Sequence, residues 1–410
     1  MSLTRFLPTP SDRMGILWSP HPIDGCVVLE YGPAGTTHFS MSLFGELGES
    51  QQDRLFTTHM SEDDVVMGDV SRLEKAIVEI DRSFSPKVIF VVASSVAAVI
   101  GTDIKGVCSY MQEQVSAKLI AFEQGGFRGD YSVGLTEAYK LLVKELPADE
   151  PEPQPDTVNL IGFSMGSYRA LSDRPELERL LEEAFGLKIG ACLCGETSIE
   201  KIEQMGGAAL NLVLREEGLP AAQMLKTRFG TPIVAGTPYG WKGTLDWLQK
   251  IADALGRTIN PALQAEIAEK LADASQYKMS LMMLRKDRPA VTVIGEYRAV
   301  LGVSGFFESL GLPVENKISL HSVRSIPNPD PSVKVCASEK ERLDLLRSLH
   351  HQLILADDPS LTVCPPDNVT LRFAMPVTRG AQVARHLPVM GLRGADFIAE
   401  TVEEYLQTLH

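Results

Sequence analysis

Short apolar runs alternate with helically spaced apolar residues along most of the chain. Apolar runs of this length predict buried strands, and the i, i+3, i+4 spacing between them predicts helices. In the N-terminal part, the predicted strands span residues 26–32, 54–60, 87–93 and 118–123. A helix is expected to start after Asp69 or Ser71, with Ser71 and Glu74 spaced as a capping box. Strands that alternate with helices indicate parallel sheets.

The alternation continues beyond a proline-rich acidic stretch, 147-PADEPEPQPD-156, which we interpret as an exposed linker or long loop. Two further sets of strands are predicted, at 158–162, 188–194, 210–214 and 232–236, and at 289–295, 317–323, 333–337 and 352–356. Three sets favour an α/β fold with three Rossmann-like domains over one large sheet. We place the domains at residues 1–150, 151–286 and 287–410.

Composition and charge narrow the function classes. The chain of 410 residues has a formal net charge of −14, and its Lys and Arg residues are scattered. This disfavours nucleic acids and anionic membranes as partners. The longest apolar run, 88–100, is too short to span a bilayer, and the N-terminus has no apolar signal segment. We therefore expect a cytoplasmic protein.

The usual nucleotide-binding fingerprints do not occur. No G-x-G-x-x-G follows a predicted strand, and no G-x-x-x-x-G-K-[ST] is present. The stretch 236-GTPYGWKGT-244 has the wrong spacing for a phosphate loop. We expect neither an NAD site nor an ATP site.

Ser164 lies in a possible nucleophile elbow. The run Gly162-Phe163-Ser164-Met165-Gly166 matches G-x-S-x-G of α/β-hydrolases. Histidines that could complete a triad follow it, although no oxyanion loop of the HGGG type precedes it: His321, His350, His351 and His386. The alternative is a glycine turn between a strand and a helix, and this alternative is favoured.

Two of the six cysteines are candidate ligands. Cys192 and Cys194 are two residues apart on a predicted strand, so they should share one face near its carboxyl end, where parallel sheets bind ligands. Cys194 is thus a candidate ligand or reactive thiol. Cys26 starts a buried strand just before an unusual loop. Core packing is the favoured alternative for both thiols.

Two glycine-rich loops follow predicted strands. The loop 30-EYGPAGTTHFS-40 presents His38, which could donate a proton, bind a metal or make an interface hydrogen bond. The loop 124-QGGFRGDYSVG-134 presents Arg128, which could bind an anionic group or pair with a carboxylate.

Taken together, these loops resemble component 1 of nitrogenase and its relatives, which include cofactor-assembly scaffolds and dark-operative chlorophyll-pathway reductases. The H-G-P-x-G-C motif of that family is similar to Tyr31-Gly32-Pro33-Ala34-Gly35-Thr36. Further similar segments follow in family order from about residue 57 to the C-terminal region: 57-TTHMSEDDVVMGD-69, 93-ASSVAAVIGTDI-104, 125-GGFRG-129, 158-VNLIG-162 and 386-HLPVMGLRGADFIAE-400.

The resemblance implies three Rossmann-like domains around a central cleft, and pairing with a homologous subunit or a second copy. It also implies a separate ATP-dependent iron-protein reductase as the electron donor. Around the implied cluster and interface it places Gly32, Pro33, Gly35, Thr36 and Ser95, with His38 and Arg128 as cleft candidates.

The departures from the family concern its cluster ligands. Thr36 and Ser95 occupy positions where the family has cysteines, and 208-AALNLVLRE-216 lacks the later cofactor cysteine. Iron–sulfur clusters are held mainly by thiolates. A cluster would therefore be shared with or supplied by a partner, or Cys26 and Cys194 would take new roles, or the chain would be free of metal.

Three functional hypotheses follow. The first is a subunit of a nitrogenase-like oxidoreductase with an unknown substrate. The second is a non-catalytic scaffold or binding protein for a metallocofactor or tetrapyrrole. The third is a serine hydrolase that uses Ser164.

Overall fold

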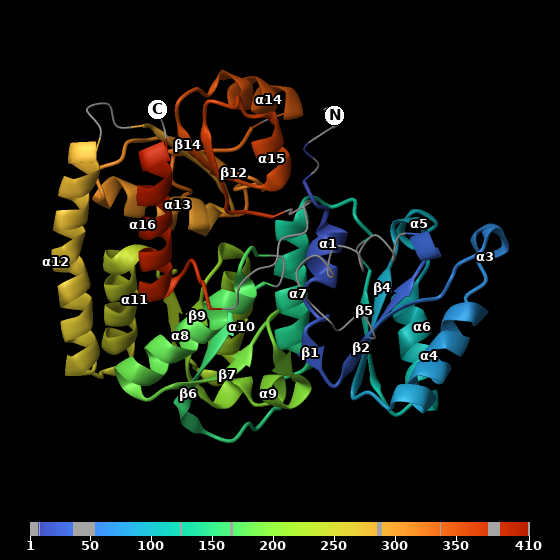
Figure 1. Ribbon diagram of the computed structural model, residues 1–410. Coiled ribbons are helices and arrows are strands. Elements are labelled where there is room, and N and C mark those ends of the chain that lie inside the picture. The colour runs from blue at the N-terminus through green and yellow to red at the C-terminus, as the bar shows by residue number, and fades with distance from the viewer. Residues whose placement is uncertain are drawn as a thin grey trace.

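Three parallel sheets form the framework of the protein (Figure 1). The computed structural model describes residues 7, 9–35, 54–123, 125–164, 167–284, 289–336, 338–375 and 386–408. Along the chain the sheets use residues 26–122, 154–235 and 291–372 in turn. The sequence prediction of an α/β fold with several parallel sheets is confirmed.

The first sheet has the strand order β3-β2-β4-β5, with two fully buried central strands. Its strands are β2 (Cys26–Tyr31), β3 (Leu55–Thr57), β4 (Val88–Ala93) and β5 (Lys118–Phe122). Successive strand residues face opposite sides. Val27 and Leu29 therefore contact α4 (Ser71–Phe84) and α6 (Ile104–Met111), whereas Val28 packs toward α7 (Tyr131–Glu145).

The second sheet has the order β10-β9-β6-β7. Its strands are β6 (Gln154–Ile161), β7 (Lys188–Cys192), β9 (Ala208–Val213) and β10 (Ile233–Ala235). The helices of this part are α8 (Ala170–Phe185), α9 (Ile199–Glu203), α10 (Leu219–Phe229) and α11 (Gly240–Leu255). A short strand, β8 (Thr197–Ser198), pairs with β1 (Ile23–Asp24). This pairing joins the part of the chain that holds the first sheet to the part that holds the second.

The third sheet has the order β13-β12-β11-β14-β15. Its strands are β11 (Val291–Gly295), β12 (Val314–Ser319), β13 (Val333–Lys334), β14 (Leu353–Ala356) and β15 (Val369–Arg372). The helices that follow these strands are α13 (Tyr297–Ser309), α14 (Glu339–Ser348) and α15 (Asp358–Val363). Ser338 caps α14 by accepting a hydrogen bond from the Glu341 N–H.

The C-terminal helix returns to the middle part of the chain. Helix α16 (Gly391–Thr408) packs against α8, α11 and the long helix α12 (Pro261–Leu284), and Figure 1 shows α12, α11 and α16 side by side. The Asp396 carboxylate accepts hydrogen bonds from Trp241 Nε1 at 2.8 Å and from Lys270 Nζ at 2.7 Å. The domain boundaries at 150 and 286 stay predictions.

The first helix crosses α7 at very short range. Helix α1 (Asp12–Leu17) contacts α7 through glycines from both helices. A Cβ added to Gly134 would lie 1.8 Å from the Asp12 carbonyl oxygen, and one added to Gly15 would lie 2.1 Å from the Tyr131 carbonyl oxygen. Only glycine permits this close approach.

Two local predictions are wrong. The N-cap of α4 is Val70, and the expected capping box of Ser71 and Glu74 does not form, since the Ser71 N–H donates to Asp69. A capping box does occur one helix earlier, where Ser61 and Asp64 satisfy each other's backbone N–H groups at the start of α3 (Glu62–Met67).

The proline-rich stretch is also shorter as a loop than predicted, because β6 already begins at Gln154 and includes Pro155. A register irregularity between Gln154 and Val158 accommodates this proline. Among the described residues, no helix is long and apolar enough to cross a bilayer.

Candidate functional site

The carboxyl ends of strands from the second and third sheets surround a central cavity. Residues that line it directly follow β6, β9, β11, β12 and β15: Gly162, Ser164, Leu214, Arg215, Glu296, Leu320 and Phe373. Trp18 and Tyr131 add a wall from the N-terminal part. Parallel sheets bind ligands at this edge, where neighbouring strands lead to helices on opposite faces. The cavity is therefore the candidate ligand site.

The cavity is narrow in this state. Its volume is about 60 Å³, which is room for a few water molecules. Pockets for drug-sized ligands have volumes of roughly 300–1,000 Å³. A cofactor of tetrapyrrole size would therefore need a wall to move.

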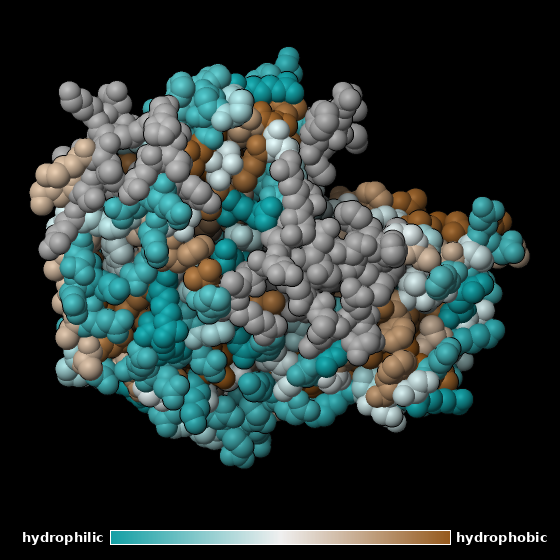
Figure 2. Space-filling model, in the orientation of Figure 1, coloured by the Kyte–Doolittle hydropathy of each residue, from teal (hydrophilic) through white to brown (hydrophobic). Residues whose placement is uncertain are grey.

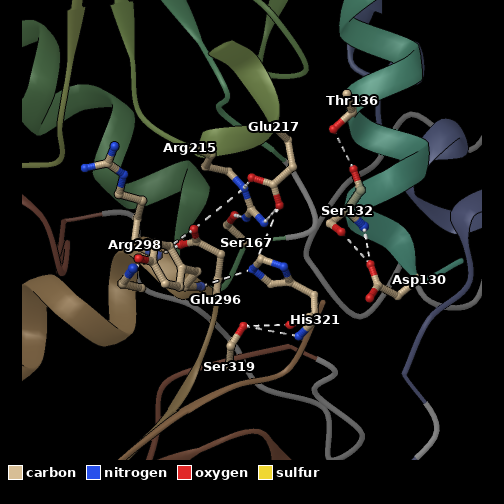
Figure 3. A network of polar contacts seen from close by, with 12 residues as sticks. Asp130, Ser132, Thr136, Ser167, Arg215, Glu217, Glu296, Arg298, Ser319 and His321 are labelled. Carbon is tan, nitrogen blue, oxygen red and sulfur yellow. Dashed lines mark hydrogen bonds and ion pairs between the residues drawn. The ribbon is translucent and has the colours of Figure 1, made fainter. Parts of the chain in front are cut away.

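A buried arginine organises the polar side of the cavity (Figure 3). The guanidinium of Arg215 donates from Nη2 to Glu217 Oε1 at 3.0 Å and from Nη1 to Ser167 Oγ at 3.0 Å. The exposed fraction of both Arg215 and Glu217 is 6%. Burial alone would raise the pKa of Glu217, but Arg215 outweighs burial and holds that pKa well below its usual range. Both groups are therefore ionised at neutral pH.

His321 lies beside this pair with both ring nitrogens engaged by the backbone. Its Nε2 accepts from the Tyr297 N–H at 3.1 Å, and its Nδ1 lies 3.1 Å from the Ser322 carbonyl oxygen. An accepting Nε2 and a donating Nδ1 define the neutral Nδ1–H tautomer. His321 thus fixes the start of α13 against the end of β12.

Glu296 extends the network to the start of α13. Its carboxylate caps this helix by accepting from the N–H groups of Arg298 and Ala299, at 3.0 and 3.2 Å. Arg298 in turn lies 2.6 Å from Glu216. Burial raises the pKa of Glu216, and Arg298 offsets part of that effect. Charges from the second and third sheets are thus paired across the cavity.

Asp130 connects the N-terminal part to the same network. It caps α7 through the Ser132 N–H and accepts from the Ser322 N–H at 2.7 Å through its other oxygen. Tyr131 meets both His321 and Trp18 edge to face, with ring centroids 5.5 and 5.6 Å apart. All three parts of the chain therefore meet at this site.

The residues taken from the family motifs lie elsewhere, at the carboxyl edge of the first sheet. Gly32, Pro33 and Gly35 follow β2, and Ser95 begins α5 (Ser95–Val99) after the neighbouring β4. The Ser95 hydroxyl donates to the Gly125 carbonyl oxygen at 2.6 Å, so the start of α5 is tied to the second glycine-rich loop. Thr36 and His38 lie outside the described residues.

Arg128 is exposed and is not among the residues that line the central cavity. Its backbone N–H lies 3.4 Å from Asp12 Oδ2. The structure thus links the loop that carries Arg128 to α1.

Ser164 lines the central cavity and is 1% exposed. His321 uses both ring nitrogens for backbone contacts, which leaves neither to act as a general base in this arrangement. We predict that a fluorophosphonate probe will not label Ser164, as read by mass spectrometry of the intact chain with Ser164→Ala as the control. Stoichiometric labelling that is absent from the Ser164→Ala variant would restore the hydrolase hypothesis.

The prediction that Cys192 and Cys194 share a face is wrong. Strand β7 ends at Cys192, and Cys194 adopts a left-handed backbone conformation with φ of 63°. The chain therefore turns between them. The Cys192 side chain packs in the core around β6 and α8, whereas Cys194 packs in the core that also contains Ile161 and Ala191.

All four fully buried cysteines are poor candidates for thiolates. Burial raises the pKa of Cys26, Cys108 and Cys192 to about 12, and it raises that of Cys194 further. The Cys26 thiol lies 3.1 Å from the Ile23 carbonyl oxygen.

We predict an order of alkylation for the six thiols. Iodoacetamide at pH 8 should modify the partly exposed Cys336 and Cys364 first, and should reach the other four only on unfolding. Peptide mass spectrometry with and without urea measures this order. Rapid labelling of Cys26 or Cys194 in the folded protein would contradict the assignment of these thiols to the core.

An iron–sulfur cluster does not fit the described residues. No group of three or more His, Cys, Asp or Glu side chains within the described ranges is arranged to hold a metal. Ser95 uses its hydroxyl to bind a neighbouring loop, and the buried cysteines are held as thiols. Cluster ligation needs several converging thiolates.

Sequence reasoning missed the central polar network. A signal was present, because Arg215, Glu217 and Glu296 come within a few residues of the ends of apolar strands. Charged residues at that position in a parallel sheet are candidates for the ligand edge.

The three parallel sheets, with a cavity at the carboxyl ends of strands from two of them, place the protein in the class of multi-sheet α/β proteins. Within that class, the chain belongs to the family of nitrogenase component 1 type oxidoreductases, whose pattern matches residues 11–407. The family resemblance seen in the sequence is confirmed.

Relatives within the family have different functions. The chain is 28% identical over 297 residues to the nitrogenase iron-molybdenum cofactor biosynthesis protein NifE of Clostridium pasteurianum, which covers 71% of this chain and 64% of that protein. It is 27% identical over 308 residues to the nitrogenase molybdenum-iron protein alpha chain of Methanosarcina barkeri, with 72% and 56% covered. It is 23% identical to a light-independent protochlorophyllide reductase polypeptide of Heliobacterium modesticaldum, with 69% and 55% covered. The chain thus spans less than two thirds of the length of these relatives.

The solved structure named "Nitrogenase Cp1 at pH 6.5" matches the whole chain. The TM-score is 0.84 at 16% identity, with 100% of this chain and 94% of that chain covered. At this identity the match supports the fold alone.

Proposed function

We propose that the chain is one subunit of a two-component oxidoreductase, in which a separate ATP-dependent iron-protein reductase supplies the electrons. Family membership over residues 11–407 supports an oxidoreductase role. The absence of a phosphate-loop motif in the sequence agrees with ATP hydrolysis on another protein. A cytoplasmic location is part of this proposal.

The observation that supports the proposal most is the set of side chains at the carboxyl edge of the first sheet. The motif loops gather there, but Ser95 and Gly125 bind each other where a cluster ligand would be needed. Large apolar side chains are exposed around the same edge: Val66, Met67, Val99, Ile100 and Phe127. Figure 2 shows apolar atoms along the upper edge of the N-terminal part, on the right of the view.

We infer that a homologous, cysteine-bearing subunit covers this edge and supplies the thiolates of any cluster. Exposed apolar groups gathered on one face are typical of subunit contacts. The exposed fractions of Val66, Val99 and Phe127 are 81%, 71% and 67%. A second copy of this chain is the alternative occupant, and it would bring no additional motif cysteines.

Anaerobic affinity purification of the full chain from its own cells tests the proposal. We expect a homologous subunit with motif cysteines to co-purify, and we expect the complex to oxidise the reduced iron protein only when ATP is present. The matched variant Val99→Asp, Phe127→Asp should lose the partner, while Met279→Asp on the exposed face of α12 should keep it. A complex that accepts no electrons would contradict the proposed catalytic role.

A second candidate function is a non-catalytic scaffold that binds a cofactor. The observation in its favour is the buried network around Arg215, which builds a polar ligand site without a recognisable redox group among the described residues. This candidate predicts cofactor binding without turnover in the same assay, so the two functions are distinguishable.

A further inference from the structure

The segment of residues 386–390 reaches the wall of the central cavity with its last two residues. Val389 and Met390 line the cavity and are 5% and 9% exposed. The segment has neither helical nor strand structure and leads directly into α16. Most other cavity residues lie at the ends of strands or in the first turns of helices, so they directly adjoin regular secondary structure.

Side chains from the start of α8 hold this segment in place. Arg169 Nη1 donates to the Leu387 carbonyl oxygen at 2.7 Å. Asp173 Oδ1 accepts from the N–H groups of Val389 and Met390, at 2.7 and 3.0 Å. These two charged side chains are supplemented by a backbone bond from the Gly391 N–H to the Pro238 carbonyl oxygen and by core packing of Val389 and Met390, and release of the segment breaks no sheet.

The cavity is too small for a ligand while this segment is in place. With about 60 Å³ available, the closed cavity holds only a few water molecules. Any larger molecule requires a wall to move, and the N–H groups of the lining residues Val389 and Met390 are held by a side chain and not by a sheet.

We propose that residues 387–390 are a removable wall of the central cavity, that Arg169 and Asp173 latch it shut, and that ligand exchange with the cavity requires its release. This inference concerns access to the cavity and does not depend on the proposed partner or on electron transfer.

The buried carboxyl group makes the latch sensitive to pH. Burial raises the pKa of Asp173 to about 7, although the Val389 and Met390 N–H groups and Arg169 act in the opposite direction. Other ionisable groups surround it: Glu176 on α8, Arg393 on α16, and Tyr239, Arg215 and Glu296 around the cavity.

The sign of the effect follows from linkage. In the closed state Asp173 binds its proton more tightly than an exposed aspartate with the ordinary pKa of 3.8. Protonation therefore favours the closed wall, and a rise of pH through about 7 favours opening.

Hydrogen–deuterium exchange of the full chain tests the latch. The opening constant of the Val389 and Met390 amides, corrected for the intrinsic exchange rate, should rise on the order of 100-fold between pH 5 and pH 7 and then level off. A peptide from β11 reports global unfolding and should stay more protected throughout.

Two variants separate the latch from general stability. Asp173→Asn keeps an acceptor but cannot ionise, so its opening constant should be independent of pH. Arg169→Met keeps an apolar stem beside Phe397 and loses the bond to Leu387, so it should open about tenfold more often. Because Arg169 lowers the pKa of Asp173, the pH-dependent rise should persist in this variant and level off at a higher pH. An unchanged pH profile in Asp173→Asn, or exchange of Val389 and Met390 only with global unfolding, would overturn the proposal.

Discussion

Replacing Arg215 with methionine is expected to lower the free energy of unfolding by about 3–5 kcal/mol. The substitution leaves the Glu217 carboxylate buried, with an exposed fraction of 6%, and removes the guanidinium that keeps it ionised. It also removes the donor to Ser167 Oγ. Urea denaturation followed by circular dichroism measures the loss.

The matched double variant separates the charge from the packing. Arg215→Met, Glu217→Leu removes both charges and keeps similar volumes, so it should be within about 1–2 kcal/mol of the wild type. The variants Arg215→Met and Glu217→Leu are also measured singly. If the double variant lost as much unfolding free energy as the two single variants added together, Arg215 and Glu217 would not be an interacting pair.

Replacing Gly134 with alanine should cost about 3 kcal/mol, because the new Cβ would lie 1.8 Å from the Asp12 carbonyl oxygen and push α1 away from α7. The same denaturation experiment measures it. Gly243 is the control, since it also lies inside a helix, α11, but has no atom within 4 Å of an added Cβ.

Gly243→Ala should stabilise the protein by about 0.5–1 kcal/mol through helix propensity. If both alanine variants changed stability by the same amount, the close α1–α7 crossing would not be what requires Gly134.

The sequence predicted the sheets well because their strands are buried on both faces. Runs such as 88-VIFVVA-93 have no polar alternation, which is typical of strands in the interior of a parallel sheet. Local polar chemistry was harder to predict. Ser71 and Glu74 have the spacing of a capping box, but the Asp69 carboxylate, two residues before Ser71, accepts from the Ser71 N–H instead, and the spacing does not show which carboxylate is preferred.

The candidate site was predicted only in part. Ser164, which was singled out from its G-x-S-x-G pattern, lines the cavity, whereas Gly32 and Ser95, which came from the family resemblance, lie at the edge of the first sheet. Arg215, Glu296 and His321 come from two different sheets, and their meeting depends on how these sheets pack. Asp173 was equally hidden, since its partners Val389 and Met390 lie 216 and 217 residues away in the chain.

Quantification of iron and sulfide in the anaerobically purified chain tests the central claim most directly: this family member does not supply its own cluster thiolates. After reconstitution with iron and sulfide, we predict no stoichiometric cluster on the chain alone, and cluster signals only in complex with a cysteine-bearing partner. A stoichiometric cluster on the isolated chain that Cys26→Ser or Cys194→Ser abolishes would contradict the account.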